Sequence, residues 1–323
     1  MESKQHQEMV QEAVRQKFKR NKPSLKATSA PHYPSSAERE YRRLSNAYMN
    51  ILNKTLKKNL PDIIAILEQN TRADAAGVRD SGTRILGAGN VESRIRYKIA
   101  EMTQELAEAL EELGLDVKLE KISALAEANS VREWKRMVRQ TLGIDIFDDY
   151  YRGDFYKGAV RKWVEDNVAM IKTVPQDSLG KLQDIILTGY REGKTIPVIR
   201  KSIMASYLVT KHTATFWARD QIAKLNASIT EAQHRDAGVR TYIWSTSRDE
   251  RVRDCHRALD GKEFSYDDPP EMWYMTKSRG KVMTGRKCNP GQDYCCRCVA
   301  IPVFNIESID LPMKEILKAA KKT

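Results

Sequence analysis

The sequence changes character near residue 236, and this change restricts the possible folds more than any other feature. Upstream of it, apolar residues recur at three- and four-residue spacing, which is the period of an amphipathic helix. Downstream, Gly, Pro and Asp crowd the span between two short runs of strand-forming residues, 241–245 and 298–304. We therefore predict a mainly α N-terminal region followed by a small α+β, Cys-rich C-terminal module.

Two stretches give the clearest helix limits in the first third of the chain. Ser35, followed three residues later by Glu38, has the pattern of a capping box and predicts a helix that runs to about Asn59. Six apolar residues spaced by three or four between positions 95 and 113 predict another helix. Gly114 follows where a helix C-cap belongs, so we expect that helix to end there.

Further helices are expected up to residue 236. Ser130 and Glu133 form a second capping-box pattern, and Gly143 closes the apolar run that follows them. Additional amphipathic stretches cover 155–173, 178–191, 195–206 and 210–236. We accordingly divide the chain into a basic irregular arm (1–34), a helical domain (35–236), the C-terminal module (237–306) and a basic C-terminal helix or tail (307–323).

Positive charge gathers at the N-terminus. The net charge is +12, and residues 1–60 hold thirteen Lys or Arg against five Glu. Clustered cations bind nucleic-acid phosphates through counterion release, without reading sequence. A solvated arm with no partner is the alternative. The residues expected to contact double-stranded DNA are Lys4, Arg15, Lys17, Lys19, Arg20, Lys22 and Lys26.

Composition excludes several classes of protein. A chain of 323 residues with 41% apolar content can bury a substantial core. It has no run of 18 apolar residues, and its first residues lack the apolar centre of a signal peptide, so we expect a cytosolic protein without membrane contact. All five cysteines fall in the last quarter of the chain, which favours thiols or metal ligands over a disulfide framework.

The cysteines suggest a structural zinc site. Cys296 and Cys298 lie two residues apart at the entrance of a predicted strand, so both thiols project from one face. The pair Asp260-Gly261 suits a tight turn and predicts a hairpin around it. A tetrahedral ion needs two more ligands, and we expect Cys288 and His256, with Cys255 from the same predicted hairpin as the alternative fourth ligand. Because the spacing is not that of paired C-x2-C knuckles, buried thiols without metal remain open.

A metal-dependent nuclease is the enzymatic alternative. Asp254, His256 and Asn289 are the residues that could serve such a site. Only one of the five histidines falls in the Cys-rich module, so a second histidine or a carboxylate cluster is missing. We therefore expect no enzymatic activity and no catalytic residues.

The C-terminal module resembles the Mu F-like minor head proteins, a head morphogenesis family of tailed phages. Residues 193–196 and 218–221 extend the resemblance upstream, although Asp220-Gln221 stands where the family has Thr-Glu. The residues that carry it are Trp244, Asp249, Arg251, Arg253, His256, Leu259-Asp260-Gly261, the pair Pro269-Pro270 and Cys296-Arg297-Cys298.

The resemblance implies a minor capsid protein that acts in head assembly and in genome delivery. Its implied location is the virion, in the capsid interior near the portal, after assembly in the host cytoplasm. The implied partners are the portal protein, the major capsid or scaffolding protein, and double-stranded DNA bound without sequence preference. We expect the helical region 36–236 to carry the portal contact. A cellular nucleic-acid-binding adaptor is a further alternative.

Overall fold

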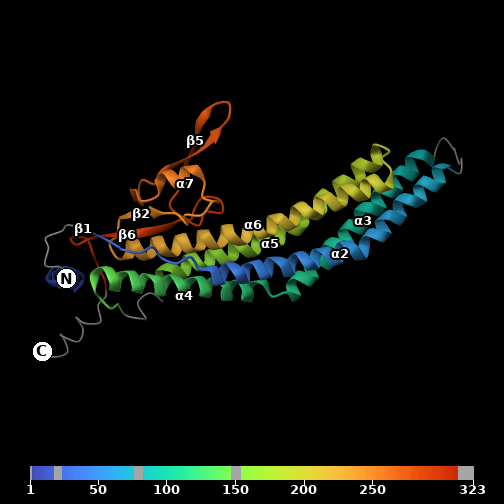
Figure 1. Ribbon diagram of the computed structural model, residues 1–323. Coiled ribbons are helices and arrows are strands. Elements are labelled where there is room, and N and C mark those ends of the chain that lie inside the picture. Colours follow the sequence, from blue (N-terminus) through green and yellow to red (C-terminus); the bar gives the residue numbers. More distant parts are fainter. Residues whose placement is uncertain (1, 18–23, 76–82, 147–153, 312–323) are drawn as a thin grey trace. The chain divides into compact units, whose positions relative to one another are not determined.

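The computed structural model describes residues 2–17, 24–75, 83–146 and 154–311, and it confirms the predicted fold class (Figure 1). Helices precede a Cys-rich segment that contains small sheets. None of the described helices combines the length and the apolar content needed to cross a membrane. The helices are α1 (Glu2–Lys17), α2 (Ser35–Ala75), α3 (Thr83–Glu112), α4 (Leu115–Leu142), α5 (Asp154–Arg191), α6 (Ile196–Asp236) and α7 (Asp254–Leu259). The strands are β1 (Ser24–Lys26), β2 (Thr241–Ser245), β3 (Glu263–Ser265), β4 (Glu271–Thr276), β5 (Gly280–Lys287) and β6 (Val299–Asn305).

The chain forms two compact units whose limits differ from the predicted domains. Unit 1 comprises residues 1–39, 121–163 and 219–323, and unit 2 comprises residues 40–120 and 164–218. Unit 1 contains the C-terminal module together with N-terminal and central segments. The limits between the units fall inside helices α2, α4, α5 and α6, where no change of sequence character marks them.

Unit 2 is built from helices with continuous apolar stripes. Helix α2 starts at Ser35 as predicted, but it passes Pro61 and reaches Ala75 instead of ending near Asn59. The buried stripe resumes after the proline with Ile63, which explains why packing overrides the loss of one backbone donor. Helix α3 follows the predicted stripe, and Gly114 after it has φ +61°, as a C-cap requires.

The second predicted helix start is wrong, because helix α4 continues through it. It runs without a break from Leu115 to Leu142, so Ser130 and Glu133 lie inside the helix and do not cap it. Their side chains make tertiary contacts within unit 1 instead: Ser130 donates to the Gln233 side chain at 2.9 Å, and Glu133 accepts from the backbone N–H of His32 at 3.1 Å. The two polar side chains do form hydrogen bonds, but with distant residues and not with the end of a helix.

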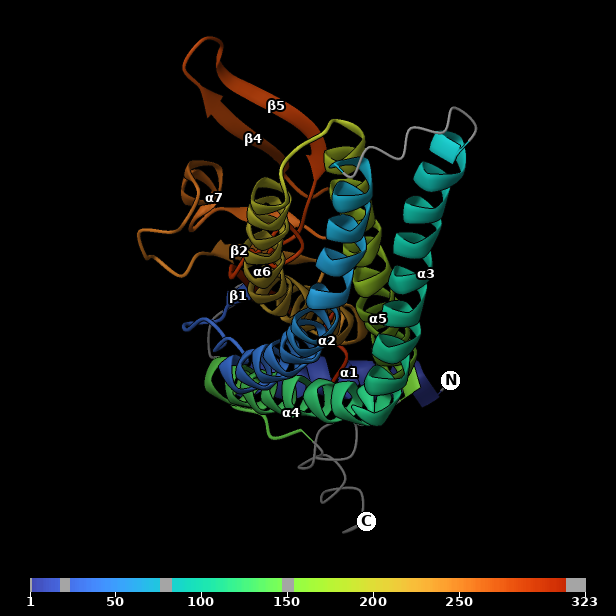
Figure 2. The same ribbon diagram turned by 90° about the vertical axis from the view of Figure 1, so that its right-hand side faces the viewer.

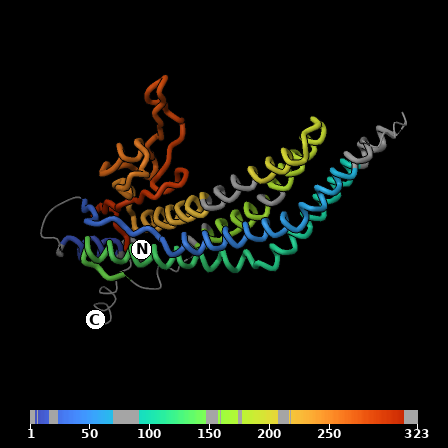
Figure 3. Tube along the Cα trace, turned by 45° about the vertical axis from the view of Figure 1, so that its right-hand side comes forward, coloured from blue at the N-terminus to red at the C-terminus, as the bar shows by residue number. Residues whose placement is uncertain are grey.

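Helices α5 and α6 are likewise single elements where two shorter stretches each were predicted. Figure 3 shows the last part of α6 leading into the Cys-rich segment. Helix α6 ends at Asp236, where the change of sequence character was expected, and strands β2 and β6 occupy the two predicted strand positions within one residue.

The sheet of unit 1 joins segments that are far apart in the sequence. Its strand order is β1-β6-β2-β3, and every neighbouring pair is antiparallel. Ser24 pairs with Asn305 at one edge, whereas Tyr242 pairs with Pro302 and with Phe264 in the centre. A separate two-stranded sheet consists of β4 and β5.

The described parts of the predicted N-terminal arm, residues 2–17 and 24–34, contain regular elements. Residues 2–17 are helix α1, with Val10 and Val14 fully buried, and residues 24–26 form the edge strand β1. The two valines sit four residues apart and pack into one core with Trp134 and Phe304. Two buried apolar residues among charged neighbours are too few to give a recognisable helical period, so the sequence did not predict this helix. The predicted C-terminal helix or tail falls largely on residues 312–323, which lie outside the described residues.

Helix α7 replaces the hairpin that was expected around Asp260-Gly261. Residues 254–259 are helical, and the chain then turns at Gly261, whose φ is +77°, before entering β3. The Asp260 carboxylate accepts hydrogen bonds from the backbone N–H of Thr246 at 2.8 Å and from its hydroxyl at 3.1 Å. Cys255 and His256 therefore lie on a helix, where consecutive side chains point in different directions.

Candidate metal centre

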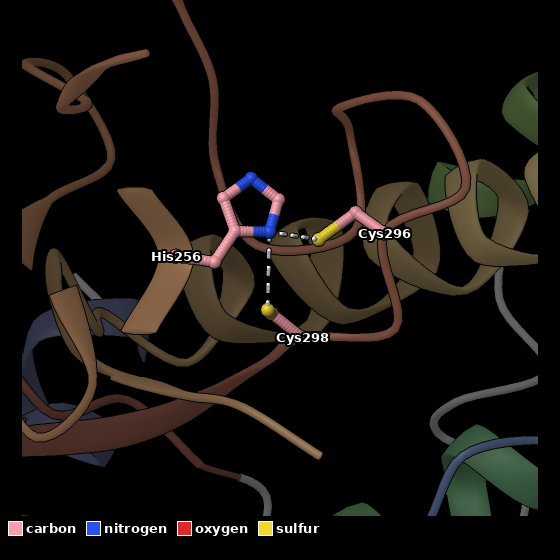
Figure 4. A group of neighbouring side chains, drawn as sticks. All are labelled: His256, Cys296 and Cys298. Atoms are coloured by element: carbon pink, nitrogen blue, oxygen red, sulfur yellow. Dashed lines mark hydrogen bonds between the residues drawn. The ribbon is translucent and has the colours of Figure 1, made fainter. Parts of the chain in front are cut away.

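The structure brings three of the predicted ligands together in a buried cluster (Figure 4). The ligand atoms of His256, Cys296 and Cys298 all lie within 4.8 Å of one another, and each of the three residues is buried. His256 comes from α7, whereas both cysteines come from the loop that enters β6. In Figure 4, one ring nitrogen of His256 faces both sulfur atoms. The two thiols therefore lie on the same side of the chain, as their spacing predicted.

The distances within this cluster fit a shared ion. Nδ1 of His256 lies 3.6 Å from Sγ of Cys296 and 3.6 Å from Sγ of Cys298. Nitrogen and sulfur ligands at about 2.0 and 2.3 Å from a tetrahedral zinc ion are about 3.5 Å apart. The same distances also suit hydrogen bonds between the ring and the thiols. The three residues could therefore hold a metal ion or act as a hydrogen-bonded group.

The other ring nitrogen of His256 is fixed by a carboxylate. Nε2 lies 3.1 Å from Oδ2 of Asp293, which is itself buried. Asp293 also accepts hydrogen bonds from Arg253 at 2.6 Å and from Arg286 at 2.8 Å. A carboxylate on the far nitrogen of a ligand histidine orients the ring and keeps Nδ1 free to bind a metal. Sequence reasoning missed Asp293 because its role depends on contacts with residues up to 40 positions away.

Electrostatic coupling appears in the pKa values. Burial lowers the pKa of His256, but the hydrogen bonds with Asp293 and Cys296 outweigh it and raise that pKa to about 9. The hydrogen bond with Cys298 and the nearby imidazole hold the pKa of Cys296 well below its ordinary value, against the effect of burial. The hydrogen bond with Cys296, together with burial, raises the pKa of Cys298. Without an ion the cluster thus favours an imidazolium at His256 beside a thiolate at Cys296; the thiolate is the form that binds metals, and His256 would release its Nδ1 proton when an ion binds.

Two features of the loop hold the cysteines in place. Gly291 has φ +86°, and a Cβ added there would lie 2.9 Å from Cβ of Ala227 and 3.1 Å from the carbonyl oxygen of Ala223, so only glycine lets the loop approach α6 this closely. Cys295 has φ +48°, which is unusual for a residue with a side chain. Its backbone N–H donates to the Asp220 carboxylate at 2.8 Å, and this contact fixes the turn before Cys296.

Asp220 therefore has a structural role in unit 1. It lies directly after Arg219 in α6, is buried, and accepts a second hydrogen bond from Lys224 at 2.7 Å. Because the chain has Asp220-Gln221 in place of Thr-Glu, its carboxylate stands one position earlier than the one in the resembled pattern. Here that carboxylate holds the loop that carries the two cysteines of the cluster.

The remaining predicted ligands lie outside the three-residue cluster. Cys288 and Cys255 are both buried, and Cys288 packs in the same small core as Cys296 and Cys298. Neither belongs to the group whose ligand atoms are mutually within 4.8 Å. Cys295 is partly exposed. Burial raises the pKa of Cys255, Cys288 and Cys295, so these three thiols stay protonated more readily than Cys296.

The residues considered for a nuclease are not assembled into one cation site. Asp254 is exposed and pairs with Arg257 at 3.3 Å, whereas His256 faces the buried thiols. The Asn289 side chain accepts a hydrogen bond from the Tyr242 hydroxyl at 2.8 Å. These three side chains therefore have separate partners within the described part of the chain.

The residues predicted to bind DNA are only partly described. Lys4 and Lys17 lie in α1, and Arg15 is exposed on the same helix. Lys26 lies in β1 and pairs with Glu263 at 3.1 Å. Lys19, Arg20 and Lys22 lie outside the described residues.

Comparison with known proteins identifies the region that contains this centre. Residues 180–301 match the family described as "Phage Mu protein F like protein", which confirms the predicted resemblance over these residues. An uncharacterized protein of Haemophilus influenzae is 31% identical over 179 residues, covering 55% of this chain. The match spans only 37% of that relative's length. No solved structure matches the chain.

Proposed function

We propose that this chain, whose residues 180–301 carry the Mu protein F-like sequence, is a structural minor head protein of a tailed bacteriophage. The family points to head morphogenesis and to association with the virion. The observation that carries the proposal is the extent of the match, which runs from the end of α5 through the metal-site loop into β6. The matched region thus contains His256, Asp293 and both cysteines of the cluster.

In this proposal the centre holds a structural zinc ion. Two thiolates balance the charge of one divalent cation, so the filled site would bury no net charge. His256, Cys296 and Cys298 are all buried. A catalytic zinc needs an open position for substrate, so a buried site is better suited to stabilising the fold.

The proposed partners follow from the family and from the charge of the chain. The portal protein would bind unit 2, whose exposed large apolar side chains include Tyr97 and Val198. The basic segment from Lys4 to Lys26 would contact packaged DNA through phosphates. These contacts would serve assembly of the head and delivery of the genome.

Complementation of a phage that lacks this gene tests the proposed function. Particles made with the wild-type protein should contain the chain in a few copies, as measured by quantitative mass spectrometry of purified virions. Without it, the yield of infectious particles should fall at least a hundredfold. Normal infectivity without the protein, or its absence from purified particles, would contradict a role in the head.

Two variants connect this function with the metal centre. Cys298→Ser removes a proposed ligand and should fail to complement, whereas Cys295→Ser, three residues away and outside the cluster, should complement normally. Equal complementation by both variants would show that the centre is dispensable for head assembly. Tyr97→Ser, on the exposed surface of unit 2, should reduce co-purification with the portal protein without affecting zinc content.

A further inference from the structure

The β4–β5 hairpin is a projecting two-stranded ribbon. Its strands pair only with each other, and Figures 1 and 2 show them extending away from the four-stranded sheet of the same unit. Its inner end is anchored by Met272, which is buried in the core around Trp244, but a two-stranded ribbon beyond such an anchor gains little stability by itself. Its existence as an ordered projection in unit 1 is therefore a reason to look for a partner.

The ribbon exposes large side chains that usually pack inside proteins. Tyr274 is 53% exposed, Met275 is 59% exposed and Met283 is 48% exposed. Cross-strand pairing places Trp273 opposite Met283 and Met275 opposite Lys281, so these four side chains share one face. Exposed apolar groups concentrated on one projecting element are typical of an interaction surface.

The same ribbon is strongly basic. Between Glu271 and Asp293 the sequence contains five Lys or Arg residues and no acidic residue. Arg286 and Lys287 at the base are paired with Asp293 and Asp268, at 2.8 and 2.6 Å. Farther out, three exposed cations form no ion pair with any described residue; they are Lys277, Arg279 and Lys281. The ammonium of Lys281 lies 4.8 Å from the centre of the Trp273 ring.

Shape and charge together favour duplex DNA as the partner. The major groove is about 12 Å wide and admits a two-stranded β-ribbon. Unpaired cations at the tip would meet phosphates, while the Met and aromatic side chains would contact sugars and thymine methyl groups. A membrane surface would require apolar residues at the tip, but the tip here reads Lys277-Ser278-Arg279-Gly280.

We propose that the β4–β5 hairpin is a second DNA-binding element, which inserts into the groove of duplex DNA and contacts phosphates through Lys277, Arg279 and Lys281. The surface is distinct from the N-terminal basic segment and from the metal centre. It requires only that the chain meets DNA, and it would give the protein a contact that is independent of its first residues.

Binding of the full-length protein to a random-sequence duplex, measured by fluorescence anisotropy over a range of salt concentrations, tests this proposal. The triple variant Lys277→Gln, Arg279→Gln, Lys281→Gln should bind at least tenfold more weakly at 0.1 M salt, since each lost phosphate contact lowers the log-log salt slope by about 0.9. The variant pair Lys277→Arg, Lys281→Arg keeps the charge and should bind like the wild type.

Matched variants separate this surface from a general loss of positive charge. Lys57→Gln, Lys118→Gln, Lys121→Gln removes the same charge from exposed helix positions and should leave the salt slope unchanged. Substituting Lys19, Arg20 and Lys22 tests the N-terminal segment by itself.

The proposal is overturned if the hairpin variant binds DNA like the wild type, if the helix control weakens binding equally, or if the hairpin mediates binding to anionic vesicles but not to DNA. Circular dichroism and zinc content of each variant show whether its fold is intact.

Discussion

The two units of this protein are stabilised in different ways. Unit 2 consists of helices whose apolar stripes supply a conventional core, including Ile95, Met102 and Leu106, all fully buried. The sheet region of unit 1 has a smaller core in which thiols, an imidazole and a carboxylate are buried among aromatic rings. Burial of apolar area tolerates small changes of geometry, whereas buried polar groups are stable only when each has its partner. The sheet region should therefore depend on a few specific contacts, and unit 2 on many interchangeable ones.

The largest difference between the units should follow loss of a metal ligand. Cys296→Ser or Cys298→Ser should abolish metal binding and unfold the sheet region at ordinary temperature, because structural zinc contributes on the order of 10 kcal/mol to folding in small zinc domains. The helical signal of unit 2 should persist in circular dichroism. Cys295→Ser is the control and should unfold like the wild type. Simultaneous loss of both units in the Cys298→Ser protein would contradict the comparison.

A cavity in the helical core should be costly but local. Leu106→Ala removes a fully buried side chain from α3 and should destabilise unit 2 by about 3–5 kcal/mol. Val117→Ala, at an exposed position of α4, should change stability by less than about 0.5 kcal/mol. Urea unfolding followed by hydrogen exchange would locate the effect. The comparison would need revision if amides near the metal centre lost protection as much as those of α3.

A single backbone contact should matter in unit 1. Gly238 has φ +72°, and a Cβ there would lie 1.9 Å from the carbonyl oxygen of Ser308, so Gly238→Ala should destabilise unit 1 by about 2–4 kcal/mol. Gly261 also has positive φ, +77°, but an added Cβ would meet nothing within 4 Å. Gly261→Ala should therefore cost only about 1–2 kcal/mol. If both variants lost the same stability in thermal unfolding, the positive φ alone would account for the destabilisation, and the close approach to Ser308 would contribute nothing.

Acid should weaken unit 1 through a buried histidine. Burial lowers the pKa of His234 to about 3, below its unfolded value of about 6.5, so between these pH values the unfolded chain binds a proton that the folded protein does not. Stability should then fall by about 1.4 kcal/mol for each pH unit of acidification within this window. His234→Gln should reduce that slope. Identical slopes for wild type and His234→Gln would contradict this assignment.

Helical periodicity predicted unit 2 well because its information is local. The apolar stripe of α3 and the turn at Gly114 can be found from neighbouring residues alone. Pro61 and the Ser130–Glu133 pair misled the prediction, since local signals for helix ends were outweighed by packing along α2 and α4. Whether a polar pair caps a helix or binds a distant partner depends on contacts that spacing does not specify.

For the sheet region, the sequence predicted which residues matter but not how they are arranged in space. The pairing of Ser24 with Asn305 joins the two ends of the chain, and no local pattern announces it. Similarly, the sequence indicated His256, Cys296 and Cys298 as ligands, but it could not show that Cys288 lies outside the cluster. Asp293 looked like one charged loop residue among many, and its importance comes from its burial beside the His256 ring.

Metal analysis of the purified full-length protein tests the central claim most directly. We expect about one equivalent of zinc per chain after purification without chelator, with X-ray absorption showing two sulfur neighbours near 2.3 Å and nitrogen near 2.0 Å. Chelation should lower the unfolding temperature of the sheet region and leave that of unit 2 unchanged. Less than about a tenth of an equivalent of zinc, together with unfolding that a chelator does not alter, would contradict the proposal that a metal ion closes this region.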